Sequence, residues 1–259
     1  MNTLVKKIIN ALGFELHRAP TIQKEPIKSY KTQNATIELI GPSGIGKTTL
    51  RKMVSKHLKF RWNLSYTTDT RAISKSSNQL DEFYRIILFR KFTSLFEQQK
   101  EVDRYAKLSA FFIKRMQQDR HLKLSGLLNQ GGWFLDDGFC HNFTLEILQA
   151  MEKNELENEV LNKFFENRNF ILLEAPINRI VENLKNRQVN YKGAGNDLLI
   201  VYGEKGIKQF IQKSINNKRK MVELSLQYGA RFYTINMMQS DGEIIGQVRD
   251  IEHEVLTKI

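Results

Sequence analysis

From residue 35 onward, the hydrophobic positions follow two patterns that alternate along the chain. Short apolar runs rich in β-branched and aromatic residues predict strands. They cover residues 35–40, 62–68, 133–135, 170–173 and 231–235. Between them, apolar residues recur at helical spacing, which predicts helices after residue 46 and over residues 143–167, 177–188, 206–228 and 243–259. Strands that alternate with helices predict an α/β fold with a central parallel sheet and right-handed crossovers.

A long section between the second and third strands contains neither glycine nor proline. Residues 81–124 are rich in phenylalanine, leucine, isoleucine and basic residues. We interpret them as a helical insertion of two or more helices. On the first helix, the spacing places Phe83, Ile87, Phe92 and Phe96 on the inward face.

The first residues form a separate pattern. One helical face carries Leu4, Val5, Ile8, Ile9 and Leu12. This amphipathic helix either packs on the main domain or lies on an anionic membrane, aided by basic residues between 6 and 18. Residues 19–31 are polar and contain two prolines, which indicates a linker. We therefore divide the chain into an N-terminal helix and linker, residues 1–33, and one domain, residues 34–259.

Composition narrows the classes of protein that fit. The chain has 259 residues, of which 41% are hydrophobic, so it can bury a core without disulfides. A lone cysteine, Cys140, is typical of a reducing compartment, most simply the cytoplasm. No apolar stretch approaches the roughly 20 residues of a spanning helix. The formal net charge of +12 favours partners that carry phosphate, which includes nucleic acid, an anionic membrane or a small substrate.

The strongest motif follows the first predicted strand. The run Gly-Pro-Ser-Gly-Ile-Gly-Lys-Thr at residues 41–48 fits the Walker A pattern G-x-x-x-x-G-K-[ST] at every required position. Its small residues let successive backbone N–H groups surround a phosphate, and the following helix points its positive end at the same place. The candidate nucleotide-binding residues are Gly41, Ser43, Gly44, Ile45, Gly46, Lys47, Thr48 and Thr49.

This motif, between a strand and an amphipathic helix, resembles the P-loop NTPase superfamily. The resemblance implies a three-layer fold, ATP as ligand, Lys47 at the β- and γ-phosphates and Thr48 as a ligand of Mg²⁺. It also implies an acidic residue at the end of a neighbouring strand, where Asp136 and Asp137 follow residues 133–135. Asp136 would then serve the metal and Asp137 would be a general base, although the two roles can be exchanged. His141, close by, is interpreted as a loop histidine with satisfied hydrogen bonds.

Within the superfamily, the chain resembles small-molecule kinases such as thymidylate kinase, and no Asn-Lys-x-Asp segment typical of signalling GTPases is present. In those kinases a late strand leads into a helix with spaced arginines and then a lid. The corresponding positions here are Arg179, Arg187 and a candidate lid over residues 187–197. The end of the second strand faces the acceptor in such kinases. There, Asp69 is a candidate general base and Arg71 a candidate ligand of an anionic acceptor.

These observations lead to a functional hypothesis with two alternatives. We expect a Mg²⁺-dependent kinase that transfers the γ-phosphoryl group of ATP to a nucleoside, a nucleotide, or a sugar or glycan precursor. Residues 6–18 also resemble the start of some bacterial surface-polysaccharide biosynthesis proteins, which would suit a cytoplasmic protein peripheral to the inner face of the membrane. The alternatives are an ATPase that acts with nucleic acid and a nucleotide-dependent regulatory switch.

Overall fold

The computed structural model describes residues 35–58, 62–63, 78–98, 101–125, 132–190 and 197–257. Several predictions from the sequence lie outside these residues. They are the N-terminal helix and linker, the end of the second strand with Asp69 and Arg71, and most of the candidate lid. The helix and membrane contact proposed for residues 4–18 therefore stay predictions.

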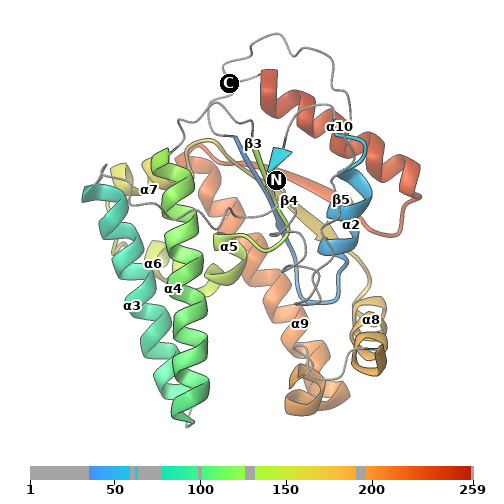
Figure 1. The fold of residues 1–259 in the computed structure, drawn as a ribbon, viewed down its shortest axis with the longest axis horizontal. Helices are drawn as coiled ribbons and strands as arrows, with labels where there is room; N and C mark the ends of the chain where they lie inside the picture. Colours follow the sequence, from blue (N-terminus) through green and yellow to red (C-terminus); the bar gives the residue numbers. More distant parts are fainter. Residues whose placement is uncertain are drawn as a thin grey trace, which may run out of the picture. The chain divides into compact units, whose positions relative to one another are not determined.

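A five-stranded parallel sheet forms the centre of the fold, with strand order β2-β3-β1-β4-β5 (Figure 1). The strands are β1 (Thr36–Ile40), β2 (Trp62–Asn63), β3 (Gly132–Leu135), β4 (Arg168–Glu174) and β5 (Arg231–Asn236). All five overlap the predicted runs. Every residue of β1 is buried, as expected for a central strand that is covered on both faces. In the register between β1 and β3, Glu38 is opposite Leu135, so β3 ends beside the middle of β1 and β1 continues for two more residues.

Helices cover both faces of this sheet and make a three-layer α/β fold (Figure 1). One face packs against α2 (Lys47–Val54), α8 (Ile177–Asn190) and α10 (Asp241–Thr257). The other face packs against α3 (Asn78–Gln98), α5 (Phe139–Asn142), α6 (Thr144–Glu152) and α7 (Asn158–Phe165). The remaining helices are α4 (Val102–Ser125), α9 (Asp197–Ser225) and a 3₁₀ turn, η1 (Leu226–Tyr228). The strand order and the helix that follows β1 confirm the predicted P-loop fold class.

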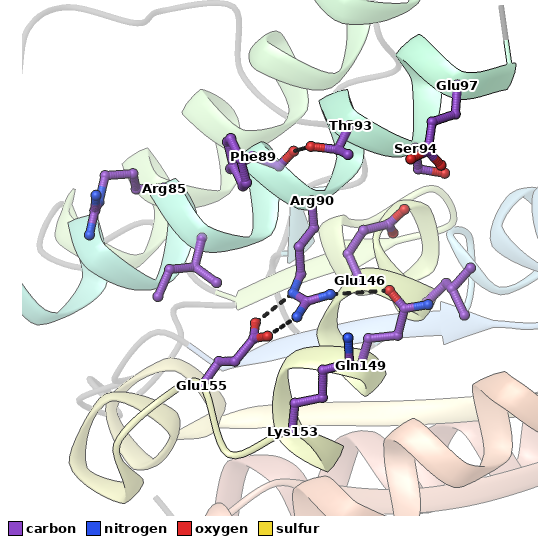
Figure 2. A pocket seen from close by; sticks show the side chains of 12 residues that line it. Arg85, Phe89, Arg90, Thr93, Ser94, Glu97, Glu146, Gln149, Lys153 and Glu155 are labelled. Atoms are coloured by element: carbon purple, nitrogen blue, oxygen red, sulfur yellow. Dashed lines mark hydrogen bonds and ion pairs between the residues drawn. The ribbon is translucent and has the colours of Figure 1, made fainter.

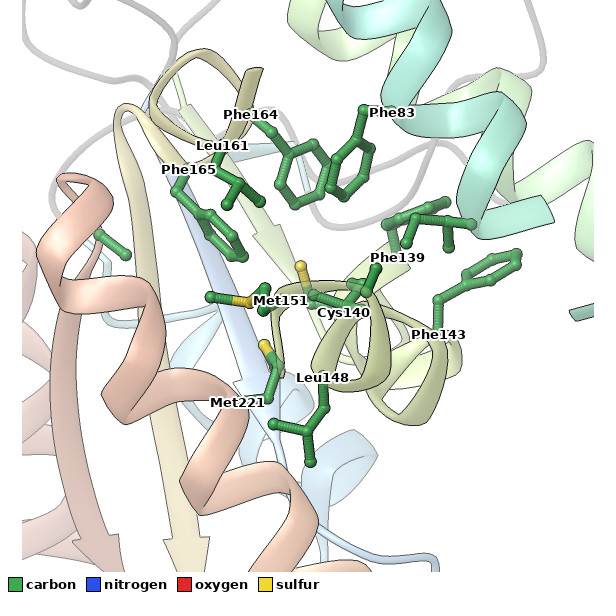
Figure 3. Packing of buried hydrophobic residues seen from close by; sticks show 14 of the residues in the cluster. Phe83, Phe139, Cys140, Phe143, Leu148, Met151, Leu161, Phe164, Phe165 and Met221 are labelled. Carbon is green, nitrogen blue, oxygen red and sulfur yellow. The ribbon is translucent and has the colours of Figure 1, made fainter. Parts of the chain in front are cut away.

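An aromatic cluster fills the second face of the sheet (Figure 3). Phe83 of α3 stacks on Phe164 of α7, with ring centroids 3.7 Å apart. Phe139 of α5 stacks on Phe143 at 4.3 Å. Because these rings come from three helices, they join the helical insertion to the sheet.

The structure corrects two predictions about the helices. The segment 143–167 is interrupted, and α6 and α7 are separated by residues that include Asn154 in the left-handed region at φ 52°. Phe83 and Ile87 face inward as predicted, whereas Phe96 is 75% exposed. Leu95 occupies the buried position instead, and Phe96 packs edge-on against Tyr105 of α4. In the described part of the chain, no helix is long and apolar enough to cross a membrane.

Phe83 and Phe96 of α3 give a matched test of this packing. We expect Phe83→Ala to lower the free energy of unfolding by about 3–5 kcal/mol, because it leaves a cavity in the aromatic cluster. Phe96→Ala should change it by less than about 1 kcal/mol, since the ring is mostly in solvent. Chemical denaturation of both variants measures the difference, and similar losses in the two would contradict the register of α3.

Candidate functional site

The loop between β1 and α2 has the backbone geometry that the Walker A motif predicts. Gly44 and Gly46 lie in the left-handed region, at φ 86° and 104°. A Cβ atom on Gly44 would lie 2.9 Å from the Cγ atom of Leu184, so only glycine lets the loop sit against α8. The Asn183 side chain of α8 donates a hydrogen bond to the Gly44 carbonyl at 2.9 Å. The loop is therefore fixed by its own glycines and by α8.

Lys47 begins α2 and folds back over the loop. Its ammonium donates hydrogen bonds to the carbonyls of Gly41, at 2.9 Å, and Pro42, at 3.1 Å. Burial, together with the charge of Lys218, lowers the pKa of Lys47 to about 7, although Asp137 and Asp136 oppose this effect. A cation held with so little water around it is stabilised by an anion such as a phosphate.

Asp136 is the carboxylate that reaches the loop. The Thr48 hydroxyl donates a hydrogen bond to its Oδ2 atom at 2.8 Å, and Arg51 Nε lies 3.3 Å from the same atom. This contact exists because β1 and β3 are adjacent and parallel, so that their carboxyl ends meet. A hydroxyl beside a carboxylate supplies the hard oxygen ligands that Mg²⁺ prefers, with water completing the shell. The described residues contain no group of three or more histidine, cysteine or acidic side chains that could hold a metal ion by itself.

Asp137 has different partners, which come from the helical insertion. Arg115 of α4 pairs with its Oδ2 atom at 2.5 Å, and Asn142 donates to its Oδ1 atom at 2.8 Å. The two neighbouring carboxylates therefore have different surroundings. Asp136 contacts Thr48 and Arg51 beside the loop, whereas Asp137 contacts Arg115 of α4. The sequence did not single out Arg115 from the other arginines of the insertion.

A buried glutamate fixes the loop that carries both aspartates. Glu38 lies in the middle of β1 at 1% exposure, and its Oε1 atom accepts a hydrogen bond from the His141 backbone at 2.6 Å. Burial raises the pKa of Glu38 to about 7, although Arg168, 3.7 Å away, opposes this. A Cβ atom on Gly138 would lie 2.2 Å from the Cδ atom of Glu38, so this position requires glycine. The signal in the sequence was an acidic residue inside an apolar strand.

A cavity of about 770 Å³ opens beside the loop and collects most of the predicted site residues. Those that line it are Ser43, Gly44, Ile45, Gly46, Lys47, Thr48, Thr49, Asp136, Asp137 and Arg187. Arg179 and Asn183 line it as well, because positions four and eight residues apart share a face of α8. Asp69, Arg71 and the lid residues 191–196 lie outside the described residues, so their roles stay predictions.

His141 departs from its predicted character. Its Nδ1 atom is buried and has no hydrogen-bond partner among the described residues, so it is not a satisfied loop histidine. Burial lowers the pKa of His141 well below its usual value, and the cations Lys47, Lys218 and Arg115 lower it further. A neutral imidazole with a free ring nitrogen therefore lies next to the loop.

Comparison with known proteins finds a partial sequence match and structures that are similar at low sequence identity. No family model matches the chain. A stretch of 52 residues, 20% of this chain, is 38% identical to the pentafunctional AROM polypeptide of Schizosaccharomyces pombe, and the match spans 3% of that polypeptide. Among solved structures, the chain is similar to deoxyadenosine kinase from M. mycoides with bound dATP, at 14% identity and a TM-score of 0.45, over 83% of this chain and 97% of that one. It is also similar to EHV4-TK, at 9% identity and a TM-score of 0.40, over 84% and 90% of the two chains.

The raised pKa of Glu38 predicts a pH dependence of stability. A carboxyl with a folded pKa of about 7 and an ordinary value of 4.5 when unfolded stabilises the fold fully below pH 4.5, and this contribution is lost as the pH rises to 7. Glu38→Gln keeps an oxygen for the His141 backbone and cannot ionise. We expect the wild type to lose on the order of 3 kcal/mol relative to Glu38→Gln between pH 4.5 and 7. Denaturant unfolding of both proteins across that range measures this difference, and a constant difference would contradict it.

Proposed function

We propose that this chain is a Mg²⁺-dependent kinase that transfers the γ-phosphoryl group of ATP to a hydroxyl of a small-molecule acceptor. The observation that carries the proposal is the Thr48–Asp136 hydrogen bond beside Lys47, in a cavity that α8 lines with arginines. Phosphoryl transfer depends chiefly on positioning and on charge stabilisation, and these residues supply both. Arg187 and Arg179 of α8 line the same cavity and add positive charge to it.

In this proposal each residue of the loop has one task. The backbone N–H groups of residues 43–48 bind the phosphates, and Lys47 neutralises charge on the β- and γ-phosphoryl oxygens. Thr48 and Asp136 hold Mg²⁺ through the hydroxyl and the carboxylate. When bound, the metal neutralises the charge that develops between the β- and γ-phosphates.

The transfer step needs a base for the acceptor. The acceptor oxygen forms a bond to the γ-phosphorus, the bond from that phosphorus to the β,γ-bridging oxygen breaks, and ADP leaves. The hydroxyl proton passes to a carboxylate, for which Asp137 and Asp69 are the candidates. Asp137 already lies in the cavity, where Arg115 and Asn142 hold both of its oxygens. Arg115 thereby acts as a positioning residue in this proposal.

The acceptor classes that we propose are a nucleoside, a nucleotide, or a sugar or glycan precursor in the cytoplasm. The net charge of +12 also supports a second candidate, an ATPase that acts on nucleic acid. Assays of ATP hydrolysis and of nucleic-acid binding distinguish the two candidate functions. Hydrolysis stimulated by DNA or RNA, with binding that falls steeply as salt increases, would favour the second candidate.

The proposed roles of Lys47 and Asp136 can be tested with variants. We expect Lys47→Ala and Asp136→Ala each to lower phosphoryl transfer by about 10²-fold or more, because each removes charge or metal stabilisation in the transition state. The assay incubates the protein with ATP, Mg²⁺ and pooled metabolites and detects the mass added by one phosphate. Circular dichroism verifies that both variants are folded.

Lys52→Ala is the matched control, because Lys52 is an exposed lysine on the same helix as Lys47. Its activity should equal that of the wild type. Full activity in Lys47→Ala or Asp136→Ala, or an absence of heat on titration of the wild type with nucleotide, would refute the proposed function.

A further inference from the structure

A second cavity, of about 630 Å³, lies between α3, α6 and α9. His141 lines both this cavity and the one beside the phosphate-binding loop, so the two meet at that residue. The volume is within the range of small-molecule sites. If the proposed function holds, this is where an acceptor can lie next to the nucleotide.

Lys218 is the unusual residue of this second cavity. It lines the cavity from α9 and is 8% exposed. In the part of the chain that the structure describes, no hydrogen bond or ion pair reaches its ammonium. Glu38 and Glu146 attract this ammonium, although neither forms a direct ion pair with it. A largely buried charge without a direct partner is costly, and an anion in the cavity that Lys218 lines would stabilise it.

The other charges of the cavity do not remove this excess. Lys91 is compensated, because its ammonium lies 3.0 Å from Glu146 and 4.5 Å from the centroid of the Phe112 ring. Lys213 lies five residues before Lys218 on α9, is exposed and lines the same cavity. Three lysines and one glutamate therefore leave an excess of two positive charges.

The surface cavity between α3 and α6 is a useful contrast (Figure 2). Its central cation, Arg90, is partly buried and is fully engaged: Nε donates to Glu155 at 2.7 Å, Nη2 pairs with the same carboxylate, and Nη1 faces Gln149. Although this cavity is about as large, at 750 Å³, its central charge is already paired. The excess around Lys218 is thus a property of the second cavity and not of every cavity in the protein.

We propose that the second cavity binds an acceptor that already carries a phosphate group, which Lys218 and Lys213 hold. A phosphate monoester bears a charge of about −1.5 to −2 near neutral pH and matches an excess of two positive charges. His141 lines both cavities, so its ring lies where the acceptor and the nucleotide would meet. At the cavity wall, Tyr202 and Phe210 stack on each other at 4.8 Å and offer an aromatic surface to a ring of the acceptor. This inference rests on the proposed function and narrows its acceptor to a phosphorylated small molecule.

The first experiment uses inorganic phosphate as the probe. The full chain is saturated with AMP-PNP and Mg²⁺, so that the loop at residues 41–48 is occupied, and its melting temperature is followed as phosphate replaces chloride at constant ionic strength. We expect phosphate to raise the melting temperature of the wild type, because a ligand that binds only the folded state stabilises it. The rise should be absent in Lys218→Met, which keeps the length of the side chain without its charge. Lys208→Met, an exposed lysine of the same helix, should respond as the wild type does.

The outcomes separate this inference from the proposed function. No rise with AMP-PNP itself would contradict the nucleotide site. A rise with AMP-PNP but no phosphate effect in the wild type, or an equal effect in Lys218→Met, would overturn only the second cavity's assignment.

A second experiment identifies the source of the phosphate. Phosphorylated compounds and their parent alcohols, such as thymidine monophosphate with thymidine and glucose 6-phosphate with glucose, are compared as acceptors for transfer from ATP. We expect a phosphorylated member to be preferred, and Lys218→Met to raise its KM by about tenfold or more, while the KM for ATP changes much less. Equal use of both members of a pair, or a preference that Lys218→Met retains, would overturn the proposal.

Discussion

The site depends on one constraint, the adjacency of β1 and β3 in a parallel sheet. Their register brings the end of β3 beside the loop that follows β1, and Thr48 then reaches Asp136 across 88 positions of sequence. The same adjacency places Glu38 under the loop after β3, where it accepts the His141 backbone N–H. A shift of one residue in β3 would point its side chains to the other face of the sheet and separate Asp136 from Thr48. The chemistry at this edge therefore follows from strand pairing more than from any single side chain.

This constraint explains what the sequence could and could not predict. The loop at residues 41–48 is local, since its glycines and its lysine lie within one strand–helix unit, and the sequence predicted it in full. Asp136 was predictable because the end of an apolar strand is a local pattern as well. Arg115 and Glu38 were missed, because their importance arises from contacts with distant residues, Arg115 with Asp137 and Glu38 with the His141 backbone. Lys218 was missed because the sequence does not show that a lysine of α9 is buried in the wall of a cavity. Phe96 was assigned inward because periodicity alone does not decide which of two adjacent residues, Leu95 or Phe96, faces the core.

The structure also buries a network of charged side chains. Glu38 and Arg168 are both almost inaccessible to solvent, and Arg168 also pairs with Asp119, which accepts a hydrogen bond from Tyr84. Such a network is held at a desolvation cost, so its value lies in fixing geometry and not in stability alone. Here the fixed element is the turn at Gly138, from which Asp136 and Asp137 point in different directions. A rigid turn keeps the proposed metal ligand and the proposed base apart.

A charged side chain of the second cavity, Lys218, acts on Lys47 of the first, and this affects how ligands would bind. Lys47 and Lys218 repel each other, which contributes to the lowered pKa of Lys47, and burial lowers the pKa of Lys218 to about 8. An anion beside either lysine favours the charged form of both, since it offsets part of their mutual repulsion. A triphosphate bound at the loop, as we propose, would offset the charge of Lys47 and so reduce its repulsion with Lys218, although it would also repel the phosphate of the proposed acceptor. In this proposal the nucleotide and acceptor sites interact through these charges, and the interaction requires no movement of the backbone.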